Sequence, residues 1–434
     1  MICMAQPTPF GSGSTGLGQC LLSESSPYSY LRVKILIVSF TFPPNKDGIS
    51  EAASIMASGF LGKGWEVEVA TSPVEPPRSE MAWRGARIHE FTFTGNGLIK
   101  YPLRGDLDNY QLFLERGDWD VVIFHAYSWS IYVPLKNLSA ISGKKILVSH
   151  GYYALQWVRA KSFPWGLGVL FMSALQALQM FFWVAKIDRV VYLSNRADFK
   201  AFFDHWIAKF MRFQGRRVIP NGVDPAVRGR DAKGFRQGLG IANEQVLFLC
   251  VANYSRRKDQ GYAAQAFRAA NLANAVMVFI GSEFNGESAR FQAEDEALPA
   301  SQKTGRVIWL EKVDRNATLD ALAACDVFVL SADHEAQPIV LLEAMREAKP
   351  WVARDAGCIA EMPGGISVRS KNEMARQMVR LHAEHDLRTL LGSQGRNAVE
   401  RTYNYNNYVD SYCDLVSEMV LGNAAHMNCG NTQG

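Results

Sequence analysis

Two glutamates eight positions apart carry the clearest chemical signal in this sequence of 434 residues. Glu335 follows the apolar segment 326–330, which is typical of a buried strand, and Glu343 lies in a helical pattern that starts behind Pro338. Ligands of open α/β sheets bind at the carboxyl ends of the strands, and a helix N-terminus offers free amides and partial positive charge to phosphate. Two carboxylates in such a place suit a ligand with hydroxyl groups next to phosphates, as in a nucleotide sugar.

The spacing of these glutamates and the start of the helix resemble the retaining GT-B glycosyltransferases of family 4. The resemblance implies that Glu343 binds the ribose hydroxyls of the donor nucleotide and that Glu335 lies beside the transferred sugar. It also implies donor contacts for Gln337, Pro338 and Ile339 at the helix start. The alternative interpretation is one carboxylate near a helix start and one solvated surface glutamate.

A second motif, Ile219-Pro-Asn-Gly-Val-Asp224, lies about one Rossmann-type half ahead of the two glutamates. Asn-Gly forms turns that need positive φ, and the aspartate can cap the segment that follows. Taken alone the hexapeptide could be a plain turn. It is similar to the family's sequence near the hinge between the domains, and its distance from Glu335 supports that interpretation.

The loop 251–260 resembles the family's segment in which a lysine neutralises the pyrophosphate of the donor. Lys258 takes the place of that lysine, and Asn253 stands where the family commonly has an arginine. Arg256 or Arg257 could supply the missing charge, and the sequence leaves this choice open. Cationic side chains over a diphosphate stabilise it as a leaving group.

Three further residues follow predicted strands and take positions of the family's site by resemblance. Gly48 matches one glycine of a Gly-Gly pair and would let the backbone approach a phosphate or the acceptor. His150, after the strand predicted at 145–149, would hydrogen-bond a sugar hydroxyl or steady developing charge. Gly357 would lie near the nucleotide base.

The strand and helix patterns alternate along the chain, which predicts parallel sheets covered on both faces. The strands are expected at 33–40, 66–71, 121–125, 145–149 and 189–193, and after a break at 246–252, 276–281, 307–310, 327–330 and 351–354. The predicted fold class is α/β, and the resemblance implies a GT-B fold with two Rossmann-like doubly wound domains facing across a cleft.

The expected domains are residues 31–220, on the acceptor side, and residues 221–402, on the donor side. An amphipathic helix at 403–421 is expected to cross back onto the first domain, by resemblance. The ends, 1–30 and 422–434, are expected to be disordered.

Composition excludes several classes of protein. The formal net charge is only +4, which gives no case for a nucleic-acid partner, and hydrophobic residues make up 48% of the chain, as in globular proteins. The seven cysteines include no C-x-x-C pair, which favours reduced thiols and a cytoplasmic location. Two Asp-x-Asp pairs, at 106–108 and 118–120, follow no convincing strand, so we expect no metal and no cofactor besides the donor.

The segment 163–185 contains no charged residue and lies within the basic stretch 144–217. Apolar and aromatic residues framed by cations are typical of interfacial helices at anionic lipid surfaces. A helix at 163–186 could therefore contact the inner face of the cytoplasmic membrane, or it could be a buried crossover helix.

These observations together predict a metal-independent glycosyltransferase. It would transfer a hexose from a nucleotide-diphosphate sugar to a glycan or lipid-linked acceptor with retention of configuration, in polysaccharide or glycolipid biosynthesis. Two alternatives remain open at this point: a nucleotide-sugar epimerase of the same fold, and a non-catalytic protein that binds glycans or nucleotide sugars.

Overall fold

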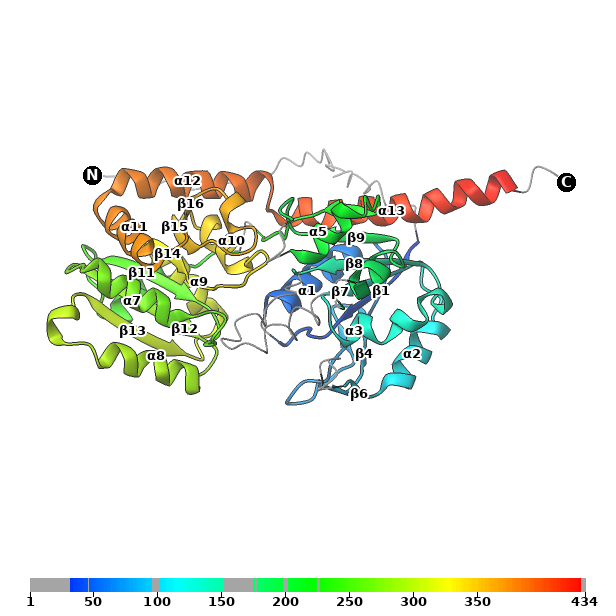
Figure 1. The fold of residues 1–434 in the computed structure, drawn as a ribbon, viewed down its shortest axis with the longest axis horizontal. Coiled ribbons are helices and arrows are strands. Elements are labelled where there is room, and N and C mark those ends of the chain that lie inside the picture. Colours follow the sequence, from blue (N-terminus) through cyan, green and yellow to red (C-terminus); the bar gives the residue numbers. More distant parts are fainter. Residues whose placement is uncertain are drawn as a thin grey trace, which may run out of the picture.

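The computed structural model describes residues 32–45, 47–95, 102–151, 175, 178–197, 202–224 and 227–430. The expected tail 1–30, most of the expected helix 163–186 and the last four residues lie outside this part. The described chain forms two α/β domains that lie side by side, each with its own sheet (Figure 1). The expectation of two doubly wound domains is confirmed.

The sheet of the first domain has eight strands in the order β10-β9-β8-β7-β1-β2-β4-β3. All neighbours are parallel except β3, which is antiparallel to β4. The apolar runs of β1, β7 and β8 are buried, as expected for central strands of a parallel sheet. The strands are β1 Lys34–Ser39, β2 Glu66–Thr71, β3 Ala82–Trp83, β4 Ala86–Glu90, β7 Val121–His125, β8 Lys144–Ser149, β9 Arg189–Tyr192 and β10 Arg216–Val218; β5 Phe93–Thr94 and β6 Arg104–Gly105 form a separate small pair.

The sheet of the second domain has six parallel strands in the order β13-β12-β11-β14-β15-β16. The strand order reverses between β11 and β14, which makes this pair a topological switch point. The strands are β11 Val246–Val251, β12 Ala275–Gly281, β13 Arg306–Glu311, β14 Val327–Leu330, β15 Trp351–Arg354 and β16 Gly365–Val368.

Helices cover both faces of each sheet. One face of the first sheet packs on α1 and α13, and the other packs on α2, α3 and the segment that leads into β9. The helices of the first domain are α1 Gly48–Gly62, α2 Leu107–Arg116, α3 Trp129–Tyr132 and α5 Phe203–Phe210. Those of the second are α6 Ala232–Gly238, α7 Gln260–Ala270, α8 Gly286–Glu296, α9 Arg315–Ala324, α10 Ile339–Arg346, α11 Lys371–Ala383 and α12 His385–Arg401.

The last helix, α13 (Tyr405–Gly430), leaves the second domain and runs along the first (Figure 1). Tyr408, Tyr412 and Val416 belong to the apolar cluster between α1 and the first sheet. The predicted crossing onto the first domain is thus seen in the structure. The helix continues to Gly430, beyond the end expected at residue 421, so residues 422–430 are helical where a disordered tail was expected.

In the part of the chain that the structure describes, no helix combines the length and the apolar character needed to cross a bilayer.

Candidate functional site

The switch point of the second sheet brings two distant loops together. The loop after β11 ends at Asp259, and the loop after β14 runs to Pro338. The amide of Asp333 donates to the carbonyl of Arg257 over 3.1 Å. The hydroxyl of Ser331 donates to the carbonyl of Lys258 over 2.9 Å. These two bonds fix the loops against each other at the carboxyl edge of the sheet, where ligands of such folds bind.

Lys258 and Glu335 meet between these loops. The ammonium of Lys258 donates a hydrogen bond to Oε1 of Glu335, from 77 positions away in the sequence. The two side chains are only 18% and 10% exposed. A buried charge needs a partner, and an ammonium group has three N–H donors. Lys258 can therefore hold Glu335 and still offer donors to an anionic ligand.

Gly357 supports Glu335 through the backbone. Its φ is +55°, and a Cβ there would lie 1.8 Å from the carbonyl oxygen of Glu335. The amide of Cys358 donates to the carbonyl of Ala336 over 2.9 Å. Only glycine fits so close an approach in this conformation. In this structure Gly357 thus shapes the loop that carries Glu335. The contact of Gly357 with a nucleotide base stays a prediction.

Arg196, from the first domain, holds the same loop from across the cleft. Its guanidinium donates to the carbonyl of Gly357 over 2.7 Å and to Oδ1 of Asp355 over 2.8 Å. Sequence reasoning missed Arg196. The only sequence signal is its place just after β9, at the carboxyl edge of the first sheet, where ligand and interdomain contacts gather.

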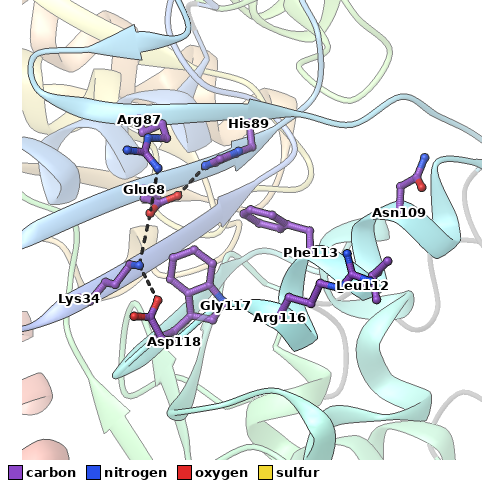
Figure 2. Close-up of a pocket in the computed structure, with 11 residues that line it drawn as sticks. Lys34, Glu68, Arg87, His89, Asn109, Leu112, Phe113, Arg116, Gly117 and Asp118 are labelled. Atoms are coloured by element: carbon purple, nitrogen blue, oxygen red, sulfur yellow. Dashed lines mark hydrogen bonds and ion pairs between the residues drawn. The ribbon is translucent and has the colours of Figure 1, made fainter.

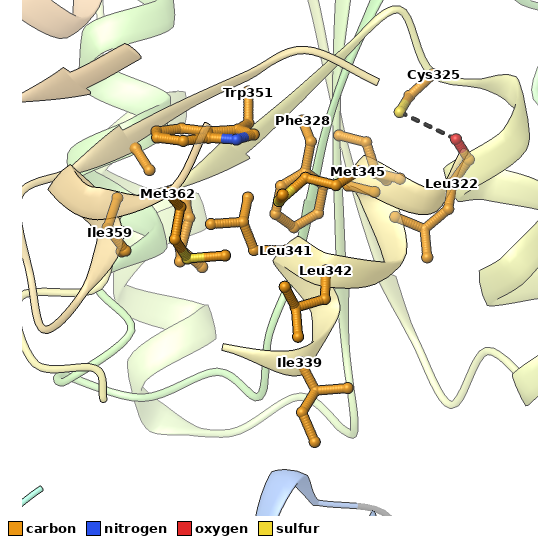
Figure 3. Close-up of a cluster of buried hydrophobic side chains, with 14 of the residues drawn as sticks. Leu322, Cys325, Phe328, Ile339, Leu341, Leu342, Met345, Trp351, Ile359 and Met362 are labelled. Atoms are coloured by element: carbon orange, nitrogen blue, oxygen red, sulfur yellow. Dashed lines mark hydrogen bonds between the residues drawn. The ribbon is translucent and has the colours of Figure 1, made fainter. Parts of the chain in front are cut away.

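Glu343 lies in α10, in the fifth position of the helix. Pro338 is the N-cap residue and Ile339 the first helical residue, so the helix starts directly behind the proline. The opposite side of the helix inserts Leu341, Leu342 and Met345 into the apolar core (Figure 3). This packing fixes the rotation of α10 and therefore the direction of Glu343.

Arg315, the first residue of α9, pairs with Glu343. Both terminal nitrogens of its guanidinium donate to the carboxylate, one of them to Oε2 over 3.2 Å. The side chain of Glu343 is 5% exposed and that of Arg315 is 42% exposed. Sequence reasoning missed Arg315, although Asp314 before it is a helix N-cap signal that places it at the carboxyl edge of β13.

Gln337 binds the segment that connects the two domains. Its Oε1 accepts from the amide of Asn221 over 2.6 Å, and its carbonyl accepts from Nδ2 of Asn221 over 3.2 Å. Both residues are buried. In this structure the side chain of Gln337 binds the Ile219–Asp224 motif, where the resemblance implied a donor contact. The hinge-proximal position expected for that motif is consistent with these bonds.

The loop residues of the first domain gather opposite this site. Asp47 caps α1 by accepting from the amides of Ile49 and Ser50, both over 3.0 Å. Gly48 is the first residue of α1, where a loop was expected, and a Cβ there would meet no atom within 4 Å. Gly48 therefore leaves open space at the N-terminus of a helix.

His150 follows β8, and His125 ends the neighbouring strand β7. Nε2 of His150 lies 3.3 Å from Nδ1 of His125. Burial lowers the pKa of His150 to about 4, and the charge of Asp47 opposes this only in part. Burial also lowers the pKa of His125 far below its usual value, with His150 adding to the effect. Both imidazoles are neutral at physiological pH, so His150 can act as a hydrogen-bonding group.

Three polar residues of the basic loop after β11 are exposed. Asn253, Arg256 and Arg257 are all exposed residues. The carbonyl of Asn253 accepts from Nε2 of Gln260 over 3.1 Å, which orders the backbone. The structure therefore presents both arginines to solvent beside Lys258 and leaves the choice between them open.

A separate hollow lies at the opposite edge of the first sheet (Figure 2). Its volume is about 500 Å³, and Lys34, Glu68, His89 and Trp119 are among its lining residues. Glu68 pairs with His89 over 2.5 Å and with Lys34 over 3.7 Å. Lys34 begins β1, so the hollow is at the amino ends of the strands, away from Glu335 and Lys258. Glu68 and Asp118 in this hollow are paired with Lys34, and the hollow is not part of the candidate site.

Two Rossmann-like domains, a site at the switch point of the second, and a last helix that returns to the first define the GT-B fold. Within it, residues 231–364 match the family described as "Glycosyl transferases group 1". This segment contains Lys258, Arg315, Glu335, Glu343 and Gly357. The predicted GT-B fold is therefore confirmed, and the match over residues 231–364 supports the suspected similarity to GT-B glycosyltransferases.

Solved structures share the fold over almost the whole chain. Sucrose-phosphate synthase from Thermosynechococcus elongatus has a TM-score of 0.70 at 16% identity, covering 90% of this chain and 100% of that one. HepE from Anabaena, in complex with UDP-glucose, has a TM-score of 0.67 at 14% identity, covering 89% and 100%. WaaG, a glycosyltransferase involved in lipopolysaccharide biosynthesis, has a TM-score of 0.63 at 16% identity, covering 89% and 99%. At these identities the likeness shows the fold.

A curated protein from Escherichia coli is similar in sequence. It is UDP-Gal:alpha-D-GlcNAc-diphosphoundecaprenol alpha-1,3-galactosyltransferase, 25% identical over 225 residues. The match covers 47% of this chain and spans about half, 54%, of that relative.

Proposed function

We propose that the protein is a glycosyltransferase that transfers a hexose from a nucleotide-diphosphate sugar to a hydroxyl of a glycan or lipid-linked acceptor. The observation that carries the proposal is the meeting of Lys258 and Glu335 at the switch point, with Glu343 in the next helix. A cation, a carboxylate and a second carboxylate in this order match the diphosphate, the sugar and the ribose of one donor molecule.

Each residue has a proposed role in this reaction. The ammonium of Lys258 offsets charge on the diphosphate as the bond to the sugar breaks. Glu343 accepts hydrogen bonds from the ribose hydroxyls, and Glu335 from the sugar. His150, from the facing domain, is a neutral hydrogen-bonding group for the sugar or the acceptor. Asn253, Gly48, Gln337, Pro338, Ile339 and Gly357 complete the proposed donor surface.

The proposed reaction keeps the configuration at the anomeric carbon and uses no metal. The bond from that carbon to the diphosphate oxygen breaks, and a bond to the acceptor oxygen forms on the same face. The proton of the acceptor hydroxyl passes to the leaving diphosphate. Closure of the two domains excludes water, which limits hydrolysis of the donor.

A lipid-linked acceptor is supported by exposed apolar side chains on the first domain. Phe182 is 57% exposed and Leu178 is 54% exposed in the segment before β9, while Phe210 is 75% exposed and Trp206 39% exposed in α5. Val184 and Ala208, one from each segment, pack on the same face of the first sheet. Aromatic residues beside lysines and arginines suit an anionic lipid surface.

The similar galactosyltransferase from Escherichia coli acts on a diphosphoundecaprenol-linked sugar by its name. We therefore propose that the protein acts at the inner face of the cytoplasmic membrane, in polysaccharide or glycolipid biosynthesis. Flotation with vesicles that contain anionic lipid, at low salt, measures the membrane contact. Protein that stays at the bottom of the gradient would contradict the membrane contact and leave the donor site as proposed.

A donor assay tests the proposed function. The protein is incubated with labelled UDP-glucose, UDP-galactose and other nucleotide sugars, with and without a lipid-linked sugar acceptor. We expect label in the acceptor only when both substrates are present. Isomerised donor without acceptor would indicate an epimerase, and binding without turnover would indicate a binding protein.

The variant Glu343→Ala tests the site. Hydrogen bonds to a charged group contribute about 1.5–3 kcal/mol, so the Kd for the nucleotide should rise by about 10- to 100-fold. Glu361→Ala, at an exposed glutamate of the same domain, is the control and should bind normally. Unchanged nucleotide binding by Glu343→Ala would remove Glu343 from the donor site.

A further inference from the structure

Glu343 is covered in this structure by a cation of its own domain. Arg315 donates to both carboxylate oxygens, and Glu343 is almost fully buried while Arg315 is substantially exposed. The guanidinium therefore lies between the carboxylate and solvent. Any hydroxyl group that binds Glu343 must share the carboxylate with Arg315 or displace it.

Arg315 has a second acidic neighbour across the cleft. Glu51 lies in the first turn of α1, in the first domain. Its charge acts on Arg315, and the charges of Arg315, Glu343 and Arg346 act on Glu51. Ala52, next to Glu51, belongs to the same buried apolar cluster as Leu319 of α9, so the start of α1 packs on the cluster that the helix of Arg315 helps to form. Arg315 and Glu51 form no salt bridge among the described residues, so in this structure the guanidinium stays with Glu343.

The local charges favour a shared arginine. Crowding by protein atoms raises the pKa of Glu51, Arg315 opposes this shift, and Glu343 adds to it. The two carboxylates thus repel each other from opposite domains, and Arg315 is attracted to both. A long arginine side chain at the start of a helix can change partners by rotating its own bonds, without moving the helix.

We propose that Arg315 exchanges Glu343 for Glu51 when the ribose of a nucleotide-sugar donor occupies Glu343. The exchange rests on the proposed function, because it needs a diol on Glu343. Donor binding would then draw the domains together, because the guanidinium of Arg315 in the second domain pairs with Glu51 in the first. Arg315 is in this sense a positioning residue for the closed state.

A double-mutant cycle tests the exchange. The Kd of UDP, GDP and ADP is measured by calorimetry for the full chain, and the nucleoside diphosphate that binds most tightly is carried through the cycle. Glu51→Gln should weaken its binding by about 3- to 5-fold, as for a partly exposed ion pair. In the Arg315→Gln background the same change should have no effect, because the guanidinium that Glu51 receives is absent.

The extent of domain closure is a second measurement. If Glu51 had only a local role, Glu51→Gln would not alter it. The radius of gyration from small-angle X-ray scattering should fall when the nucleotide is added to the wild-type protein, and fall less in Glu51→Gln. Glu400→Gln, at an exposed glutamate of α12, is the matched control and should behave as wild type.

The outcomes separate the two proposals. If Glu51→Gln leaves the Kd and the closure unchanged, or weakens binding equally in both backgrounds, the exchange is wrong and the donor site stands. If no nucleoside diphosphate binds the wild-type protein, the proposed function fails and the exchange fails with it.

Discussion

His150 is a partly buried imidazole whose surroundings determine its protonation. Burial lowers its pKa to about 4, whereas an unfolded chain takes up this proton near pH 6.5. The folded protein therefore binds fewer protons than the unfolded chain between these values. Stability is complete above pH 6.5 and is lost as the pH falls toward 4.

Replacement of His150 should make the free energy of unfolding depend less on pH. Between pH 7 and pH 5 we expect the free energy of unfolding of His150→Gln to fall by about 1 kcal/mol less than that of the wild type, allowing for partial exposure. Urea unfolding at the two pH values measures this. His385→Gln, at a histidine side chain that is 78% exposed, is the control. If the free energy of unfolding falls equally in the wild type and in His150→Gln, the lowered pKa of His150 would be contradicted.

At the scale of single residues, the sequence predicted some side-chain contacts and missed others. Lys258 and Glu335 follow strands that are adjacent at a switch point, so their meeting could be expected from motif and topology. Arg315 and Arg196 could not be predicted in the same way. Their roles depend on which carboxylate or carbonyl the folded chain brings within reach, and no local pattern encodes that.

The loop that carries Glu335 depends on a second loop behind it. Gly357 has φ +55°, and a Cβ there would lie 1.8 Å from the carbonyl oxygen of Glu335. A side chain at this position must push the acidic loop away or strain the backbone, and the loop is also tied to the first domain through Arg196.

Gly357→Ala should therefore lower both stability and donor binding. Strain of this kind costs about 1–3 kcal/mol, which urea unfolding measures, and nucleotide affinity should fall with it. Gly286→Ala is the matched control, because a Cβ at Gly286 would meet no atom within 4 Å. Normal nucleotide binding by Gly357→Ala would show that the loop does not depend on this contact.

Strands with apolar, β-branched runs were predicted well from the sequence, and short or polar elements were not. β1, β11 and β14 lie within the expected segments. β16 was missed because its segment, Gly-Ile-Ser-Val, has no continuous apolar run. α8 was missed because its residues are mostly polar, and its start is set by an Asn285 capping box.

At the scale of the whole molecule, α13 ties the end of the chain to the first domain. A Cβ at Gly59 in α1 would lie 2.4 Å from a methyl group of Val409 in α13, so the two helices pack at close range. The same cluster includes Tyr408 and Tyr412. The crossing helix was predicted by resemblance, but its close packing on α1 depends on a glycine that has no distinctive sequence context.

Gly59→Ala should loosen this contact. Overpacking of a tight interface costs about 1–3 kcal/mol, and Gly59→Ala combined with Val409→Ala should recover much of the loss. Gly62→Ala, in the same helix, should be neutral because a Cβ there meets no atom within 4 Å. Urea unfolding and limited proteolysis of α13 measure the difference. Equal stability of the Gly59 and Gly62 variants would contradict the close packing.

The return of α13 to the first domain also bears on how the chain is made. Synthesis proceeds from the amino terminus, and domains generally fold as they emerge. The first sheet is complete after β10, yet one of its apolar faces is covered by residues of α13. Until those residues have left the ribosome, a stripe of hydrophobic surface on the nascent first domain stays uncovered, and a chaperone is the natural cover for it.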